Sequence, residues 1–125
     1  MKTTISTDKA PAAIGPYNQA VEINGLIYTA GQIPLDPATG KLVDTSFTDR
    51  VHQVMQNLQG ILEAAGSDFS KVVKTTIFVT DLGQYADLNS VYAEYFEHEA
   101  PARSAVQVAA LPMGTDVEIE MVAHK

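Results

Sequence analysis

One arginine and one glutamate near the end of the chain have the residue types and spacing needed for acid–base chemistry on a small carboxylic acid. Segment 101–108 (PARSAVQV) alternates as a strand does, and so does segment 117–121 (VEIEM). Alternation places Arg103 on one side of the first strand, and Glu118 and Glu120 on the more polar side of the second. If the strands are neighbours, we expect a guanidinium and a carboxylate on the same side of a sheet, away from the larger apolar residues. A planar cationic fork binds a carboxylate, and an acid beside it moves a proton.

An exposed ion pair on a solvated sheet face would have the same pattern. Surface salt bridges between strands are common and need no binding site around them. The spacing of Arg103 and Glu118 therefore leaves both a structural pair and a functional site open.

Strands and helices elsewhere in the chain must position these two side chains. An edge strand at 3–7 is followed by two extended segments, 17–23 and 26–30, which Asn24-Gly25 joins as a tight hairpin turn. The N-terminal part of the chain is therefore predicted to be a small antiparallel sheet.

Two amphipathic helices are predicted in the remaining chain. Ser46 begins the first as an N-cap, and apolar residues then recur every three or four positions until Gly66 ends it. The second covers about 82–98, and Pro101 forbids its continuation. Between them, the β-branched segment 72–80 predicts a strand.

The resulting order, β-β-β-α-β-α-β-β, predicts one α+β domain over residues 1–125. Two helices cover only one face of such a sheet. The other face carries Val, Ala, Thr, Phe and Tyr as well as Arg103 and Glu118, and is too apolar to remain in water. A chain of 125 residues has no third layer to supply. We therefore expect this face to meet another copy of the same chain.

The composition argues against several classes of partner and cofactor. Eight Lys and Arg against fifteen Asp and Glu, a formal net charge of −7, provide no basic cluster for nucleic acid. The absence of cysteine excludes disulfides and thiolate chemistry. No apolar run is long enough for a membrane span and no secretory signal is recognisable, so we expect a cytoplasmic protein. The three histidines lack metal-ligand spacing, and no phosphate-binding or dinucleotide motif is present, so we expect no metal and no cofactor.

Four parts of the chain resemble the signature segments of the RidA/YjgF family of imine and enamine deaminases. In chain order they are 10–17 (APAAIGPY), 29–34 (TAGQIP), 74–82 (KTTIFVTDL), and the pair formed by 101–106 (PARSAV) and 117–119 (VEI). The similarity therefore runs over essentially the whole chain. It implies a chorismate-mutase-like α+β subunit that assembles as a homotrimer, with three clefts at the subunit boundaries.

The resemblance implies catalytic roles for three residues. Arg103 matches the arginine that holds the substrate carboxylate, and Glu118 matches the glutamate that positions water or exchanges a proton. The V-E-I setting distinguishes Glu118 from Glu120, which we interpret as a solvated carboxylate at the rim. Tyr17 would bind the substrate or a water through its hydroxyl; the alternative is a buried structural tyrosine.

Five further residues are implied to bind substrate. Gly31 would let a backbone N–H approach the ligand closely, although a simple bend would also use glycine. Asn89 and Tyr85 are expected to border the site from the second helix. Two positions depart from the common family pattern, Ala105 for cysteine and Ala30 for serine. If these positions contact the substrate through backbone N–H and C=O groups, alanine preserves the interaction. If the serine hydroxyl orients the attacking water, activity or substrate preference would differ.

The implied activity is the hydrolysis of 2-enamino and 2-imino acids to 2-oxo acids and ammonia. Substrates of this class are 2-aminoacrylate, its tautomer 2-iminopropanoate, and 2-iminobutanoate, so the physiological role would be the control of metabolite damage. One alternative is a non-catalytic regulatory trimer that binds small carboxylates. An endoribonuclease or a chaperone of the same family is a further alternative.

Overall fold

The elements of the chain follow in the predicted order. The computed structural model describes residues 1–125 and contains β1 (Thr3–Ile5), β2 (Ala20–Ile23), β3 (Leu26–Thr29), α1 (Phe47–Ala64), β4 (Val72–Val79), α2 (Tyr85–Ala93), β5 (Ala102–Gln107) and β6 (Val117–His124). Short 3₁₀ turns precede β4, α2 and β6, at Phe69–Lys71, Leu82–Gln84 and Pro112–Gly114. The α+β class and the order β-β-β-α-β-α-β-β are thus confirmed.

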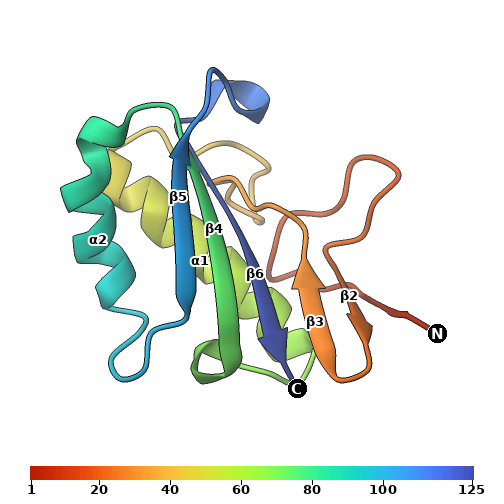
Figure 1. The fold of residues 1–125 in the computed structure, drawn as a ribbon. Helices are drawn as coiled ribbons and strands as arrows, with labels where there is room; N and C mark the ends of the chain where they lie inside the picture. Colours follow the sequence, from red (N-terminus) through yellow and green to blue (C-terminus); the bar gives the residue numbers. More distant parts are fainter.

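The six strands form one mixed sheet in the spatial order β1-β2-β3-β6-β4-β5, with both helices on the same side (Figure 1). Only β4 and β5 are parallel, and α2 makes the crossover that joins them. The last strand, β6, enters the middle of the sheet and pairs antiparallel with β3 and β4. None of the helices is both long and apolar enough to cross a membrane.

The condition under which Arg103 and Glu118 would share a side, that their strands are neighbours, is not met, because β4 lies between β5 and β6. Arg103 stands opposite Thr75, and Thr75 opposite Met121. Residues directly opposite each other share a face, so Arg103 projects to the helix side, where Thr75 and Met121 are buried. Glu118 stands opposite Phe78 on the other, helix-free face. The two charged groups are thus on opposite sides of the sheet.

The position of β5 explains this arrangement. A central strand could not place a charged residue on the helix side without burying it. Since β5 is an edge strand, Arg103 lies at the border of the core and keeps partial exposure. Alternation alone assigned Arg103 to the wrong face, because it does not show which side of an edge strand the helices cover.

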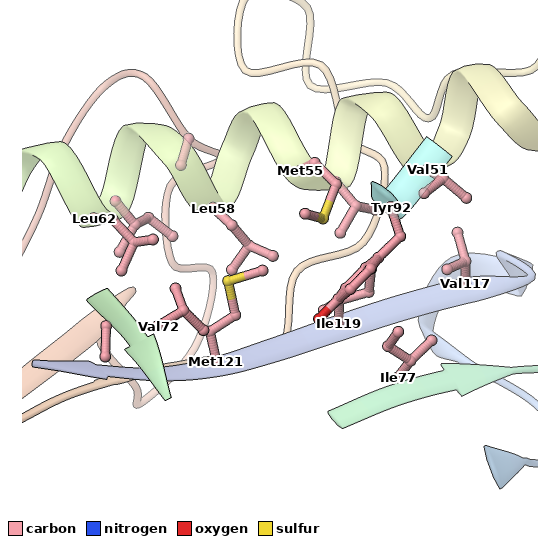
Figure 2. Close-up of a cluster of buried hydrophobic side chains, with 14 of the residues drawn as sticks. Val51, Met55, Leu58, Leu62, Val72, Ile77, Tyr92, Val117, Ile119 and Met121 are labelled. Carbon is pink, nitrogen blue, oxygen red and sulfur yellow. The ribbon is translucent and has the colours of Figure 1, made fainter. Parts of the chain in front are cut away.

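The hydrophobic core lies between α1 and the sheet (Figure 2). The apolar stripe of α1 points at the helix-side residues of β6, as the sequence pattern predicts. The facing side chains are Val51, Met55, Leu58 and Leu62 on the helix and Val117, Ile119 and Met121 on the strand. Each such side chain contributes about 1.5–3 kcal/mol when fully buried.

Local signals at the ends of the elements agree with the sequence, apart from the first two strands and the length of α2. The strand expected over 3–7 ends at Ile5, and the one expected over 17–23 begins only at Ala20, which leaves Tyr17 in a loop. The Ser46 side chain accepts a hydrogen bond from the Asp49 amide, and Asn24 and Gly25 adopt φ of 52° and 78°, as their hairpin turn requires. The second helix was expected over 82–98 but ends at Ala93. Beyond it, Phe96 packs edge-on against Phe69, with ring centroids 5.4 Å apart, and this packing replaces further helical turns.

Candidate active site

Six of the eight predicted site residues line two hollows on different parts of the surface. The first, which we call the Glu118 cavity, has a volume of about 420 Å³ and is lined by Tyr17, Ala30, Gly31 and Glu118 together with Pro11, Ala12, Ile14, Gln32, Ile33, Leu35, Pro112 and Met113. The second, the Arg103 cleft, has a volume of about 300 Å³ and is lined by Asn89 and Arg103 together with Tyr92, Ala93, Phe96, Ala100 and Pro101. Tyr85 and Ala105 line neither hollow but lie close to Arg103. Tyr85 contacts the Arg103 side chain, and Ala105 follows Arg103 in β5.

The Glu118 carboxylate lies against Gly31. A Cβ placed on residue 31 would stand 2.9 Å from the Glu118 carboxyl carbon, so only glycine leaves room for the acid. The backbones on either side are held together by Gln32 and Ile119, whose N–H groups each donate to the other's carbonyl oxygen at 2.8 and 3.1 Å. The close approach predicted for Gly31 is therefore present, with Glu118 as the neighbour.

The surroundings of Glu118 favour its protonated form. Burial raises the pKa of the Glu118 carboxyl above its ordinary value of 4.5, and the nearby charge of Glu120 raises this pKa further. Glu118 is the only charged side chain in the lining of its cavity. A carboxyl with a raised pKa is suited to exchange a proton near neutral pH.

Tyr17 borders the Glu118 cavity from a loop, where 49% of its surface is exposed. The base of this loop is held by the buried Gln19, whose side-chain amide accepts from the Thr7 N–H and donates to the carbonyls of Thr7, Ala10 and Pro11. The alternative of a buried structural tyrosine is therefore wrong, because nearly half of the Tyr17 surface is exposed.

Two tyrosines of α2 hold the Arg103 guanidinium. Arg103 Nη2 donates to the Tyr85 hydroxyl at 2.6 Å, and the guanidinium carbon lies 5.2 Å from the Tyr85 ring centroid and 4.9 Å from that of Tyr92. Tyr92 is itself fixed by a hydrogen bond of 2.8 Å to Thr75. Stacking on aromatic rings orients the planar fork and leaves most of its donors free.

Arg103 forms no salt bridge within the chain. The alternative of a structural ion pair between Arg103 and Glu118 of the same chain is therefore wrong. Asn89 borders the cleft from α2, and Ala105 follows Arg103 on the same face of β5, packed against the core. The Arg103 cleft presents a cation without a salt bridge beside small and aromatic side chains.

The sequence pattern did not identify Tyr92 or the apolar lining of the Glu118 cavity as parts of the site. Tyr92 belongs to the buried side of α2, where 6% of its surface is exposed. Its contact with Arg103 depends on the β4–α2–β5 crossover, so no pattern among neighbouring residues in the sequence predicts it. The apolar lining combines three separate loops and has no local signal either.

A third and larger hollow, of about 570 Å³, lies at the end of α2 and contains none of the predicted residues. Glu94, Glu97 and Glu99 contribute to its lining. Three acidic side chains repel an anion, so this hollow is unsuited to a small carboxylate.

Comparison with known proteins adds independent information. Residues 7–125 match the protein family described as Endoribonuclease L-PSP. The chain is 50% identical over 123 residues to the 2-iminobutanoate/2-iminopropanoate deaminase of Mus musculus, covering 98% of this chain and 91% of that protein. It is 49% identical over 122 residues to the chloroplastic Reactive Intermediate Deaminase A of Arabidopsis thaliana, covering 98% of this chain but 65% of the longer plant protein.

A solved structure agrees with the fold over nearly the full length. The crystal structure of E. coli TdcF with bound serine has a TM-score of 0.93 and 41% sequence identity, and the match covers 98% of each chain. The fold and the sequence thus point to the same group of proteins.

Proposed function

The chain belongs to the Endoribonuclease L-PSP family, also called the RidA/YjgF family, and from this premise we propose that it hydrolyses 2-imino acids and their 2-enamino tautomers to 2-oxo acids and ammonia. The proposed substrates are 2-aminoacrylate, 2-iminopropanoate and 2-iminobutanoate. These are short-lived species, so the physiological role would be to remove them before they react elsewhere. We place this activity in the cytoplasm.

One observation carries the proposal. The Glu118 cavity contains an acid of raised pKa, and the Arg103 cleft contains an oriented guanidinium without a salt bridge; we call these two hollows the half-sites. The guanidinium of Arg103 offers parallel N–H donors that match a carboxylate. The carboxyl of Glu118 is suited to exchange a proton with water and with nitrogen. The serine bound in E. coli TdcF is a small molecule with a carboxylate, which supports such a ligand here.

We further propose that the half-sites combine across the boundary between subunits of a homotrimer. Arg103 and Glu118 project from opposite faces of one sheet, so a site that contains both needs residues from two copies. The helix-free face also carries exposed apolar side chains, among them Tyr28, Val73 and Val106. Burial of this face against other copies would remove those side chains from water.

In the proposed reaction, Arg103 holds the substrate carboxylate. Glu118 of the neighbouring copy accepts a proton from the water that attacks the imine carbon. Starting from the protonated imine, the oxygen of a water molecule forms a bond to this carbon while a water proton passes to Glu118. Return of that proton to the nitrogen makes the amine a leaving group. The carbon–nitrogen bond then breaks as the hydroxyl oxygen forms the C=O double bond, and the hydroxyl proton passes through Glu118 to the departing ammonia. The products are the 2-oxo acid and ammonium. Tyr17 and backbone groups near Gly31 and Ala105 complete the polar lining.

This chemistry needs no cofactor in the proposal. Positioning and one acid–base group are worth about 10²–10⁴-fold, which is enough for imines that already hydrolyse readily in water. An endoribonuclease activity, which the family description names, would require a basic surface. The net charge of −7 and the acidic pair Glu118 and Glu120 on the helix-free face argue against it.

A coupled assay tests the proposal. Threonine dehydratase produces 2-iminobutanoate, and semicarbazide traps this imine as a semicarbazone that absorbs ultraviolet light. The purified protein should suppress semicarbazone formation, and Arg103→Ala should not. Equal semicarbazone formation with the protein and with buffer would contradict hydrolysis. It would favour the alternative of a non-catalytic protein that binds small carboxylates.

A further inference from the structure

Asn57 is a polar residue on the otherwise apolar, buried side of α1, and its exposed fraction is 0%. An amide in such a place is costly unless its donors and its acceptor find partners. Asn57 Nδ2 donates to the carbonyl oxygen of Leu35 at 2.9 Å and to that of Ile33 at 3.4 Å. Asn57 Oδ1 accepts a hydrogen bond of 2.9 Å from Gln53 Nε2. The buried amide therefore fastens a loop that is distant in the sequence to the middle of α1.

The loop that this amide fastens forms one wall of the Glu118 cavity. Ile33 and Leu35 both line the cavity. Gly31, two residues earlier, contacts the Glu118 carboxylate. The backbone pairing of Gln32 with β6 fixes one end of this segment, and the amide on α1 fixes the other.

We propose that Asn57 is a positioning residue for the proposed reaction, because its amide keeps segment 31–35 against Glu118 in the geometry that proton exchange requires. Asn57 does not itself line the cavity, so it acts through the loop. The inference rests on the proposed function for the reaction. The position of the loop is a property of the folded chain and is measurable without a substrate.

The same face of α1 also anchors the other two loops of the cavity. Arg50, Asn57 and Gly60 are spaced by seven and three residues, which places them on one side of a helix. Arg50 Nε and Nη2 donate to the two carboxylate oxygens of Asp116 at 2.8 and 2.7 Å, which fixes the segment just before β6. A Cβ on residue 60 would stand 2.8 Å from the Cβ of Lys9, so the N-terminal loop packs directly on the helix there. Asn57 lies in the middle of this row of anchors.

The first test removes the amide and keeps a side chain of similar size. Asn57→Leu deletes both N–H donors to the loop. We expect kcat for 2-iminobutanoate to fall about 10-fold or more, because the loop no longer fixes the acid in its productive position. KM should change little, since Arg103 still holds the substrate carboxylate in the other half-site. Gln53→Leu removes only the bond to the Asn57 oxygen and should cost less activity than Asn57→Leu.

A second readout does not depend on activity. Burial raises the pKa of the Glu118 carboxyl, and segment 31–35 contributes to that burial through Gly31. A loosened loop admits water, so the pKa of Glu118 should fall toward its ordinary value of 4.5 in Asn57→Leu. The titratable groups beside it, Glu120 on β6 and Tyr17 across the cavity, are unchanged in this variant. Titration of the carboxyl ¹³C resonance, assigned with Glu118→Gln, measures the shift, and the acidic limb of kcat/KM should move to lower pH with it.

A core variant of α1 controls for a general loss of stability. The side chain of Leu62 points at the sheet, near Val72 and Met121 (Figure 2). Leu62→Val should lower the melting temperature and leave both kcat and the titration of Glu118 as in wild type. If Asn57→Leu does not fold, Asn57→Ser replaces it, because the serine hydroxyl is too short to bond both loop carbonyls. The same fall in kcat and in the pKa of Glu118 is then expected.

The outcomes separate this inference from the proposed function. A folded Asn57 variant with wild-type kcat and a wild-type titration of Glu118 would overturn the positioning role. A loss of kcat in Leu62→Val as large as that in the Asn57 variant would overturn it too, since stability alone would then explain the effect. Failure of the wild-type protein to hydrolyse 2-iminobutanoate would contradict the proposed function. The NMR titration would still decide whether Asn57 holds the loop against Glu118.

Discussion

Gly31 and Glu118 are in direct contact, and the Glu118 carboxylate occupies the space that a side chain at residue 31 would need. The contact joins the end of the β2–β3 hairpin to the middle of the sheet. It explains why glycine is required at this position even though its backbone is not in the left-handed region. The Glu118 carboxylate therefore fits at this position because residue 31 has no side chain, and not because a hydrogen-bond partner holds it.

Gly31→Ala should displace the Glu118 carboxylate and lower kcat/KM for 2-iminobutanoate by about 10²-fold, the typical consequence of a 1 Å misplacement. The fold should survive, because the group that must move is the end of a flexible side chain. Semicarbazone kinetics and the melting temperature measure the two effects. Gly15→Ala, whose new Cβ would make ordinary contacts of 3.5 Å with the Tyr17 ring, is the control. Full activity of Gly31→Ala would show that the contact is not needed.

Glu118→Gln should lower kcat by about 10²–10⁴-fold, because the amide does not exchange a proton. The same substitution should raise the melting temperature at pH 7. The pKa of Glu118 is higher in the folded than in the unfolded chain. At neutral pH the ionised carboxylate therefore destabilises the native state relative to the unfolded state. This gain should vanish below about pH 4, where the group is protonated in both states. A variant that is less stable than wild type at pH 7 would contradict the effect of burial on this group.

The pH dependence of the reaction should follow Glu118. Since the carboxylate accepts the proton of water, kcat/KM should fall as the pH drops through the raised pKa of Glu118, which lies above the ordinary 4.5. Glu120→Gln removes the second cause of the shift. The acidic limb of the profile should therefore move to lower pH, with little change of the plateau. An acidic limb at the same pH in wild type and Glu120→Gln would exclude this coupling.

Arg103 variants should affect substrate binding through geometry as well as charge. Arg103→Ala should lower kcat/KM by about 10²-fold or more, and Arg103→Lys should recover only part of it, because a lysine ammonium lacks the planar fork. Tyr85→Phe removes the hydrogen bond of 2.6 Å but keeps the ring. We expect a several-fold rise of KM with kcat nearly unchanged, as measured by initial rates. Equal activity of Arg103→Lys and wild type would rule out bidentate binding.

A mixing experiment tests whether the active site is shared between subunits. Arg103→Ala and Glu118→Gln should each be inactive alone. When the two variants are unfolded, mixed in equal amounts and refolded together, about a quarter of the sites should combine an intact Arg103 with an intact Glu118 from the next copy, if assembly is random. The mixture should therefore regain about a quarter of the wild-type activity per site. No recovery in mixed trimers, verified by a tag on one variant, would place the two groups in separate sites.

Local patterns in the sequence were sufficient for most of the secondary structure. The stripe of α1, its Ser46 cap and the Asn24-Gly25 turn each depend on residues close together in the chain, and each is confirmed. The extent of α2 was not predictable in the same way. Its end at Ala93 depends on the packing of Phe96 against Phe69, which is distant in sequence.

The family, the order of the elements and the residue types available for chemistry all follow from the amino-acid sequence. Which of these residues share a hollow depends on the three-dimensional fold. Alternation fixes the relative sides of residues within one strand, but the side that faces the helices depends on strand order and on the crossover through α2. For this reason Arg103 and Glu118 lie on opposite faces of the sheet. The apolar lining of the Glu118 cavity likewise forms only when three loops that are distant in the sequence come together.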